Sequence, residues 1–167
     1  MASENYIVIN GKKAELTEEQ LRQLGIEVEK KNPFARRKYN EAYYYINTIG
    51  EVKVFYEHEN YTNHGNFNAS NYCTDRNLMQ QRALHETLSR LLWRYSMEHD
   101  GDKIDWSNHN QTKFLIGYDY PDRRFCADTY WGTKYLGGNF FYTREIAENA
   151  IEEIIKPFMK EHPDFVW

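Results

Sequence analysis

Arginine and aromatic side chains lie close together at two places in the sequence. They are Arg36, Arg37, Tyr43 and Tyr45 at the first place, and Arg124, Tyr130 and Trp131 at the second. Aromatic faces stack on bases and other rings, and guanidinium groups form paired hydrogen bonds with phosphate or carboxylate. We therefore expect these residues to bind a nucleotide-like ligand or an acidic patch on a protein. A tyrosine-lined sheet with ordinary surface arginines would produce the same pattern, so that alternative stays open.

Residue patterns typical of catalysis or of metal binding are missing from the sequence. His85 and Glu86 could be an acid–base pair, but adjacent residues on a helix point about 100° apart and do not share a target. His58 and His64 flank a polar segment without a third ligand at a recognisable spacing. No glycine-rich phosphate loop follows a predicted strand. We therefore expect no catalytic residue, no metal site and no cofactor, and a protein that is not an enzyme.

The composition limits the compartment and the partners. The chain of 167 residues carries a net charge of −4 and contains 14 Tyr, 9 Phe and 4 Trp. This acidic balance disfavours a nucleic-acid partner, because nucleic acids are bound by clustered Lys and Arg. No apolar run approaches the ~20 residues that span a bilayer, and the first residues lack the pattern of a secretion signal. We expect a cytoplasmic protein without a membrane partner, in which Cys73 and Cys126 stay reduced.

A small ββα unit is predicted at the N-terminus. An Asn-Gly pair at 10–11 separates two short apolar runs, which is the strongest short-range signal for a hairpin. Thr17 and Gln20 then have the spacing of a capping box at the start of a helix. We place this unit at residues 1–26, and we interpret the charged residues 27–41 as a linker to the rest of the chain.

Residues 42–167 are predicted to form the main domain. Alternating apolar and polar residues indicate strands at 42–49, 51–58, 112–119, 124–131 and 139–142. Apolar residues at helical spacing indicate helices at 75–99 and from residue 143 onward. The asparagine-rich segment 59–72 is expected to be a loop, because it is too polar to pack. The fold class is therefore α+β, with a mostly antiparallel sheet of about five strands and two main helices packed on it.

The long helix carries two apolar strips. One is rich in leucine and predicts the side that faces the core. The other consists of Met79, Trp93 and Met97 among charged residues. Another part of the domain should cover this second strip, although a partner or a second copy of the chain could cover it instead. Thr74 is the expected N-cap of the helix.

Two segments of the sequence are similar to a known group of proteins. They are NYCTDRNLMQQRALHETLSRLLWRYSMEHDGDKIDW at 71–106 and FFYTREIAENAIEEIIKPFMKEHPDFVW at 140–167, accompanied by NPF at 32–34 and YYYIN at 43–47. With these motifs the chain resembles small proteins encoded by phages and prophages of Gram-positive bacteria. The motifs are made of helix faces, caps and packing residues, so the resemblance assigns no catalytic residue.

The resemblance implies a biological setting more than a chemistry. Small accessory phage proteins often counter the defences of their host. The expectation is therefore a non-enzymatic inhibitor of a bacterial antiviral system, which binds a defence effector protein or sequesters a signalling nucleotide. Two alternatives stay open: a nucleic-acid-binding accessory protein of phage replication, and a small nucleotide hydrolase that uses His85 or His64.

Overall fold

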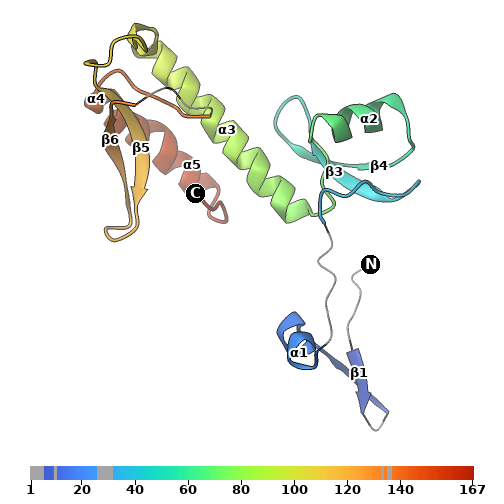
Figure 1. Cartoon of the computed structure of the whole chain (residues 1–167). Coiled ribbons are helices and arrows are strands. Elements are labelled where there is room, and N and C mark those ends of the chain that lie inside the picture. The colour runs from blue at the N-terminus through green and yellow to red at the C-terminus, as the bar shows by residue number, and fades with distance from the viewer. Residues whose placement is uncertain (1–5, 10, 26–31, 133, 135–136) are drawn as a thin grey trace. The chain divides into compact units, whose positions relative to one another are not determined.

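The chain divides into two compact units, residues 1–35 and residues 36–167 (Figure 1). The computed structural model describes residues 6–9, 11–25, 32–132, 134 and 137–167. Part of the predicted linker, at 27–31, lies outside the described residues, whereas residues 36–41 belong to the second unit. None of the described helices combines the length and the apolar character needed to cross a membrane.

The first unit contains a hairpin and a short helix. Strand β1 (Tyr6–Ile9) pairs antiparallel with β2 (Lys12–Glu15), and helix α1 spans Glu18–Gln23. The Thr17 hydroxyl accepts from the backbone N–H of Gln20, and the Gln20 side chain accepts from the backbone N–H of Thr17. This reciprocal pair satisfies two N–H groups that the first turn of a helix leaves without partners.

The second unit begins with a hairpin whose free edge is covered. Strand β3 (Ala42–Ile46) pairs antiparallel with β4 (Val52–Tyr56). On the other side of β3, Tyr44 and Cys73 exchange both backbone hydrogen bonds, at 2.7 and 3.0 Å. The Asn71 side chain continues this ladder by bonding both the N–H and the carbonyl of Ile46. Segment 71–73 therefore protects the edge of a strand that would otherwise expose unpaired backbone groups.

The expected sheet of about five strands is wrong. Strands β5 (Lys113–Asp119) and β6 (Arg124–Tyr130) form a separate antiparallel pair at the other end of helix α3 (Arg76–Glu98) (Figure 1). The last predicted strand, 139–142, contributes a single bridge between Phe114 and Phe141. Alternating residues specify which face of a strand is buried but not which strand lies beside it, so the pattern could not show that the hairpins stay apart.

Helix α3 connects two hydrophobic clusters. Near its N-terminus, Met79 and Ala83 pack with Ile46 of β3. Nearer its C-terminus, Leu88 and Leu92 belong to a larger cluster with residues from β6, from the segment at 141 and from the C-terminal helices. The helix is thus the common support of both hairpins. Its N-cap is Asp75, whose side chain accepts from the N–H of Leu78 at 3.1 Å, one residue after the predicted Thr74.

The C-terminal helical segment changes its winding before a proline. Helix α4 (Arg144–Ala150) continues into a π-helical turn, Ile151–Ile155, and then into α5 (Lys156–Glu161). In that turn the Lys156 N–H donates to the carbonyl of Ile151, five residues earlier. Pro157 has no N–H, and in a regular α-helix its ring would clash with the carbonyl four residues before it. The wider π-helical turn therefore allows the helical segment to continue through Pro157.

Candidate functional site

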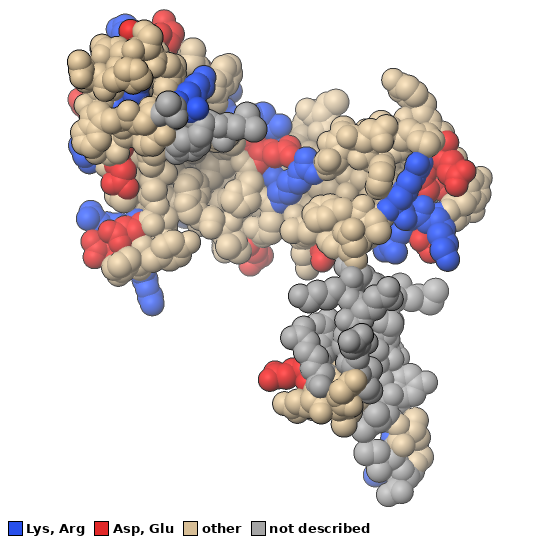
Figure 2. Space-filling model, in the orientation of Figure 1, with Lys and Arg blue, Asp and Glu red and all other residues tan. Residues whose placement is uncertain are grey.

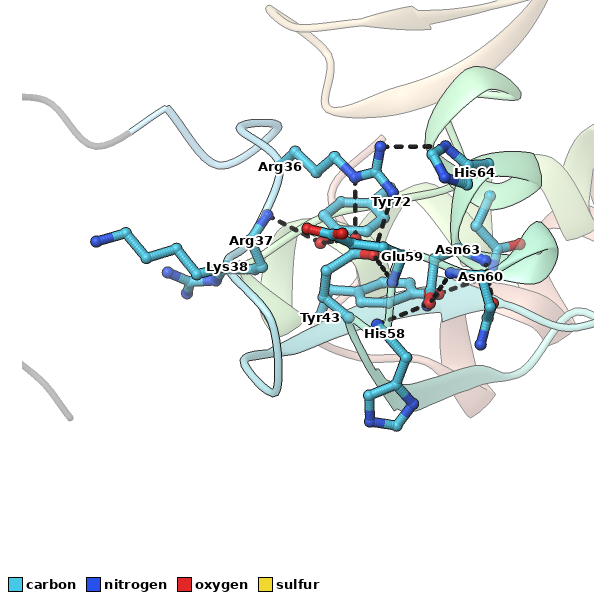
Figure 3. Close-up of polar contacts among 12 residues, drawn as sticks. Arg36, Arg37, Lys38, Tyr43, His58, Glu59, Asn60, Asn63, His64 and Tyr72 are labelled. Atoms are coloured by element: carbon cyan, nitrogen blue, oxygen red, sulfur yellow. Dashed lines mark hydrogen bonds and ion pairs between the residues drawn. The ribbon is translucent and has the colours of Figure 1, made fainter.

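Arg36, the first of the predicted binding residues, holds a buried carboxylate. Its Nε and Nη2 donate to the two carboxylate oxygens of Glu57 at 3.2 and 3.1 Å (Figure 3). Glu57 is fully buried, and it also accepts from the Tyr72 hydroxyl at 3.1 Å and from the backbone N–H of Glu59 at 2.8 Å. Paired hydrogen bonds between guanidinium and carboxylate are among the strongest in proteins. With a third contact, from Nη1 to the His64 ring nitrogen at 3.2 Å, Arg36 uses three of its five N–H donors inside the fold.

The Glu57 cluster, formed by Arg36, Glu57 and Tyr72, also shifts the ionisation of its members. Burial alone would raise the pKa of Glu57, but the hydrogen bonds from Arg36, from the Glu59 backbone and from Tyr72 outweigh burial and lower that pKa. Burial, together with the hydrogen bond to Glu57, raises the pKa of Tyr72 to about 12. At neutral pH Glu57 is therefore charged and Tyr72 is neutral. Glu57 forms a structural ion pair with Arg36, and the Tyr72 hydroxyl adds a hydrogen bond to it.

Tyr43 is likewise an internal residue. Its ring is fully buried and stacks on Tyr72 with the ring centroids 3.9 Å apart. Its hydroxyl accepts hydrogen bonds from the side chains of Asn63 and Asn66, both at 3.0 Å. Tyr45 lies beside the same rings, 6.4 Å from Tyr43 by centroid distance. The tyrosines of β3 therefore pack against their own fold.

The asparagines that contact Tyr43 belong to a helix where a loop was expected. Helix α2 spans Tyr61–Asn68, and Asn60 and Asn63 form a reciprocal capping box at its start. The prediction of a loop at 59–72 is wrong because Asn63 is buried with all its polar groups bonded. It accepts from the N–H of His58 at 2.8 Å, and it donates to the Tyr43 hydroxyl and to the Tyr56 carbonyl.

The remaining predicted residues do not converge. The Arg37 side chain points away from the Glu57 cluster (Figure 3) and lies 4.0 Å from Glu41. Arg124 and Tyr130 are at opposite ends of β6, about 20 Å apart at the rise of a strand. Arg124 pairs with the neighbouring Asp122, and Trp131 donates to the Thr112 hydroxyl at 3.1 Å. Because β3 and β6 also lie at different ends of α3 (Figure 1), the seven residues form no common face.

A different group of arginine and aromatic residues does share one surface. It is formed by Ile49 in the turn between β3 and β4 and by one side of α3, and we call it the Trp93 surface: Ile49, Arg90, Trp93, Arg94 and Met97. The three apolar members are 76%, 62% and 42% exposed, for Ile49, Trp93 and Met97 respectively. Scattered single apolar residues are normal on a protein surface, whereas a contiguous group marks an interaction site.

Three adjacent hollows meet at Trp93. The largest, of about 420 Å³, lies between the β3–β4 turn and α3 and is lined by Ile49, Arg90, Leu91, Trp93 and Arg94 together with Thr48 and Thr87. A second, of about 310 Å³, is bounded by Arg90, Trp93 and Asn139 among others. A third, of about 80 Å³, lies where Trp93 and Met97 meet Trp106. The indole thus forms a shared wall, with a basic hollow beside it.

The arginines of this surface are held only weakly by the chain itself. The nearest carboxylate oxygen to Arg90 belongs to Glu86, at 3.9 Å, and Arg94 has Glu98 at the same distance. Both distances are too long for hydrogen bonds. Over the face of the molecule drawn in Figure 2, basic and acidic side chains of the described residues lie interspersed, so this face presents local pairs of charge and not a broad basic field.

The sequence contained part of this signal. Met79, Trp93 and Met97 were expected to be covered by another part of the domain. That expectation is correct for Met79, which is 1% exposed, and wrong for Trp93 and Met97. The β3–β4 hairpin packs on the N-terminal part of α3 and leaves Trp93 exposed. A helical projection could have placed Arg90 and Arg94 beside Trp93, but it could not have shown where the covering hairpin ends.

Two other features bear on the chemistry. A hollow of about 220 Å³ between α3, β5 and Trp167 is lined mainly by apolar residues, and none of the described residues that line it has a charged side chain. Among the residues that the structure describes, no group of three or more His, Cys, Asp and Glu is placed to hold a metal ion. Neither feature provides the charged groups that a phosphate-bearing ligand requires.

Comparisons of the chain with protein-family models, with curated proteins and with solved structures find no match. The Trp93 surface is therefore the structural basis for a functional proposal.

Proposed function

We propose that this chain is a binding protein and not an enzyme, and that it contacts a protein partner through the Trp93 surface. The observation that carries the proposal is Trp93 itself, a tryptophan 62% exposed at the junction of three hollows and flanked by two arginines. Tryptophan and arginine are the residue types most enriched among those that dominate the binding energy of protein interfaces.

The shape of the surface favours a protein over a nucleotide. Small-ligand sites bury about 70–90% of their ligand. Here the basic hollow is bounded by Ile49 and Trp93, which are themselves largely exposed, so a nucleotide would stay mostly in solvent. The apolar part also continues beyond that hollow to Met97. A partner that covers Ile49, Trp93 and Met97 together must be larger than a nucleotide.

The resemblance to small phage and prophage proteins suggests what this partner is. We propose that the chain is a phage-encoded inhibitor that binds a defence effector protein in the cytoplasm of the host bacterium. Binding alone would be enough, because an inhibitor that occupies a functional surface needs no catalytic residue. The motifs at 71–106 and 140–167 that carry the resemblance include the helix that presents Trp93.

An infection assay tests the proposal. Bacterial strains that each carry one antiviral defence system would express the chain and then be infected with a phage that the system restricts. We expect the wild-type chain to restore plaque formation against at least one system and Trp93→Ala to abolish this effect. Trp131→Ala is the matched control, because Trp131 is 60% exposed but lies outside the Trp93 surface.

Two outcomes would contradict the proposal. One is a chain that changes plaque formation against none of the systems. The other is a Trp93→Ala variant that is folded and accumulates normally and yet protects the phage as well as the wild type does. Circular dichroism of the purified variants separates loss of binding from loss of folding.

A signalling nucleotide is the second candidate partner, favoured by the same pairing of an indole with guanidinium groups. A base could stack on Trp93 while Arg90 and Arg94 contact phosphate. Equilibrium dialysis against cyclic and linear nucleotides would detect such binding, and chromatography of the same samples would detect turnover. A nucleic-acid partner is opposed by the net charge of −4, and a salt-dependent gel shift would reveal one.

A further inference from the structure

We infer that the Trp93 surface recognises an acidic segment of its protein partner, in which two neighbouring carboxylates flank one bulky apolar side chain. This inference rests on the proposed function and specifies the chemistry of the partner. The carboxylates would accept hydrogen bonds from Arg90 and Arg94, and the apolar side chain would enter the hollow of about 420 Å³ between Ile49 and Trp93.

The first argument is the unused donor capacity of the two arginines. A guanidinium group has five N–H donors, and the side chains of Arg90 and Arg94 are 60% and 65% exposed. The Arg90 side chain makes one long hydrogen bond of 3.4 Å to the Thr87 hydroxyl, and no hydrogen bond from the Arg94 side chain is found among the described residues. Arg82, about two turns before Arg90, instead donates to Glu86 at 2.8 Å and to the Ser70 carbonyl. Arg90 and Arg94 therefore keep N–H donors available for a partner.

The second argument is their spacing. Residues four apart on a helix lie on the same side, about 6 Å apart along the axis. Two like charges at this spacing destabilise a helix slightly, and a bound anion would remove that repulsion. Two carboxylates on one partner segment would match the pair, each accepting from one guanidinium group.

The third argument explains why the anionic groups of the partner are carboxylates and not phosphate. Glu86 and Glu98 each lie 3.9 Å from one of the two arginines. These acids reduce the local positive potential, and the two guanidinium groups lie about 6 Å apart along the helix axis, so two separate carboxylates match them better than one phosphate, which concentrates nearly two negative charges at one point. The apolar lining by Ile49 and Leu91 also suits the side chain of a peptide better than a polar nucleotide. Charge and lining together favour an acidic protein segment.

Selection from a display library of random heptapeptides, on the immobilised full-length chain, tests the inference. Enriched sequences should carry at least two Asp or Glu residues next to Leu, Ile, Phe or Trp. A synthetic peptide of the consensus should lose at least about tenfold in affinity when its acids become Asn or Gln, and the same loss should follow from Arg90→Gln with Arg94→Gln. The matched control, Arg123→Gln with Arg124→Gln, should leave the affinity unchanged.

A second variant gives a readout that damage to the fold would not produce. Glu98→Gln removes the acid beside Arg94, so it should tighten the binding of the acidic peptide. The inference is overturned if the enriched peptides lack acids, if acidic peptides bind the Arg90 and Arg94 variants as well as the wild type, or if Trp93→Ala leaves selection unchanged.

The infection assay shows whether only the inference of an acidic partner segment is wrong or whether the proposed function is wrong as well. If Trp93→Ala abolishes protection of the phage and the double arginine variant retains it, the surface is the working one and the acidic partner is wrong. If Trp93→Ala also retains protection, the proposed function itself is wrong.

Discussion

At Glu57 one buried carboxylate connects chain segments that are far apart in sequence. It accepts from Arg36, from Tyr72 and from the backbone of Glu59. Removing one partner of a buried ion pair destabilises a protein far more than removing an exposed one, because the other charge is left buried. The side chains that the sequence indicated for binding therefore have a structural role at this place, and their effect should be seen in stability.

We predict that Glu57→Gln lowers the free energy of unfolding by about 2–4 kcal/mol at pH 7, because an amide cannot accept the paired bonds of Arg36 as a carboxylate does. The pKa of Glu57 is lowered in the folded chain, so its stabilising effect is present above the ordinary value of 4.5 and is lost as the pH falls below it. Urea unfolding at pH 7 and pH 3 measures both effects. Glu98→Gln, at an exposed carboxylate, should change little, and an equal loss in both variants would contradict the prediction.

The contribution of Tyr72 to stability has the opposite pH dependence, because it is lost as the pH rises into the alkaline range. Its pKa is about 12 in the folded chain and near 10 when unfolded, so between these values the unfolded chain loses a proton that the folded chain keeps. Rising pH therefore favours unfolding across this interval, by about 2–3 kcal/mol in total. We expect the difference in urea midpoint between wild type and Tyr72→Phe to shrink from pH 9 to pH 12. A constant difference would show that Tyr72 ionises alike in both states.

Among the elements, helix α2 is the one held mainly by polar side chains. Its sequence, YTNHGNFN, has no apolar stripe. Asn63 instead fixes it from inside, with hydrogen bonds to His58, Tyr43 and Tyr56 and with its place in the capping box. A helix of this length is not stable alone, so these few bonds decide whether it forms.

We predict that Asn63→Ala destabilises the chain by about 2–4 kcal/mol, because it leaves the Tyr56 carbonyl and the His58 N–H without their buried partners. Hydrogen exchange should accelerate most over residues 58–72 and less in α3. Asn68→Ala, at an exposed position of the same helix, is the control and should have a small effect. Equal protection of residues 58–72 in both variants would show that α2 does not depend on Asn63.

What the sequence could predict at this scale was local. The capping pair Thr17 and Gln20 and the strands β3 and β4 were identified, because caps, turns and alternation act over a few residues. Helix α2 was missed because Asn63 bonds Tyr43, twenty residues away in the chain. The exposure of Trp93 was missed for the same reason, since it depends on where the β3–β4 hairpin stops covering α3.

For the whole molecule, the distribution of buried residues separates the two units. Both hydrophobic clusters lie within residues 36–167, whereas Leu21 is the buried apolar residue described in residues 1–35. A segment of that size rarely forms a stable core alone, while the longer one is large enough to fold. The Trp93 surface is also built entirely from the larger unit.

We therefore predict that a chain of residues 36–167 unfolds cooperatively in urea with a midpoint close to that of the full chain, and that it retains the Trp93-dependent effect in the infection assay. A truncation at the other end is the matched control. Removing residues 165–167 takes away Phe165, which is buried against Phe158, and should lower the stability by about 3 kcal/mol or more. If the chain of residues 36–167 fails to fold, the first unit contributes to the stability of the second. If it folds but no longer protects the phage, residues 1–35 take part in contacting the partner.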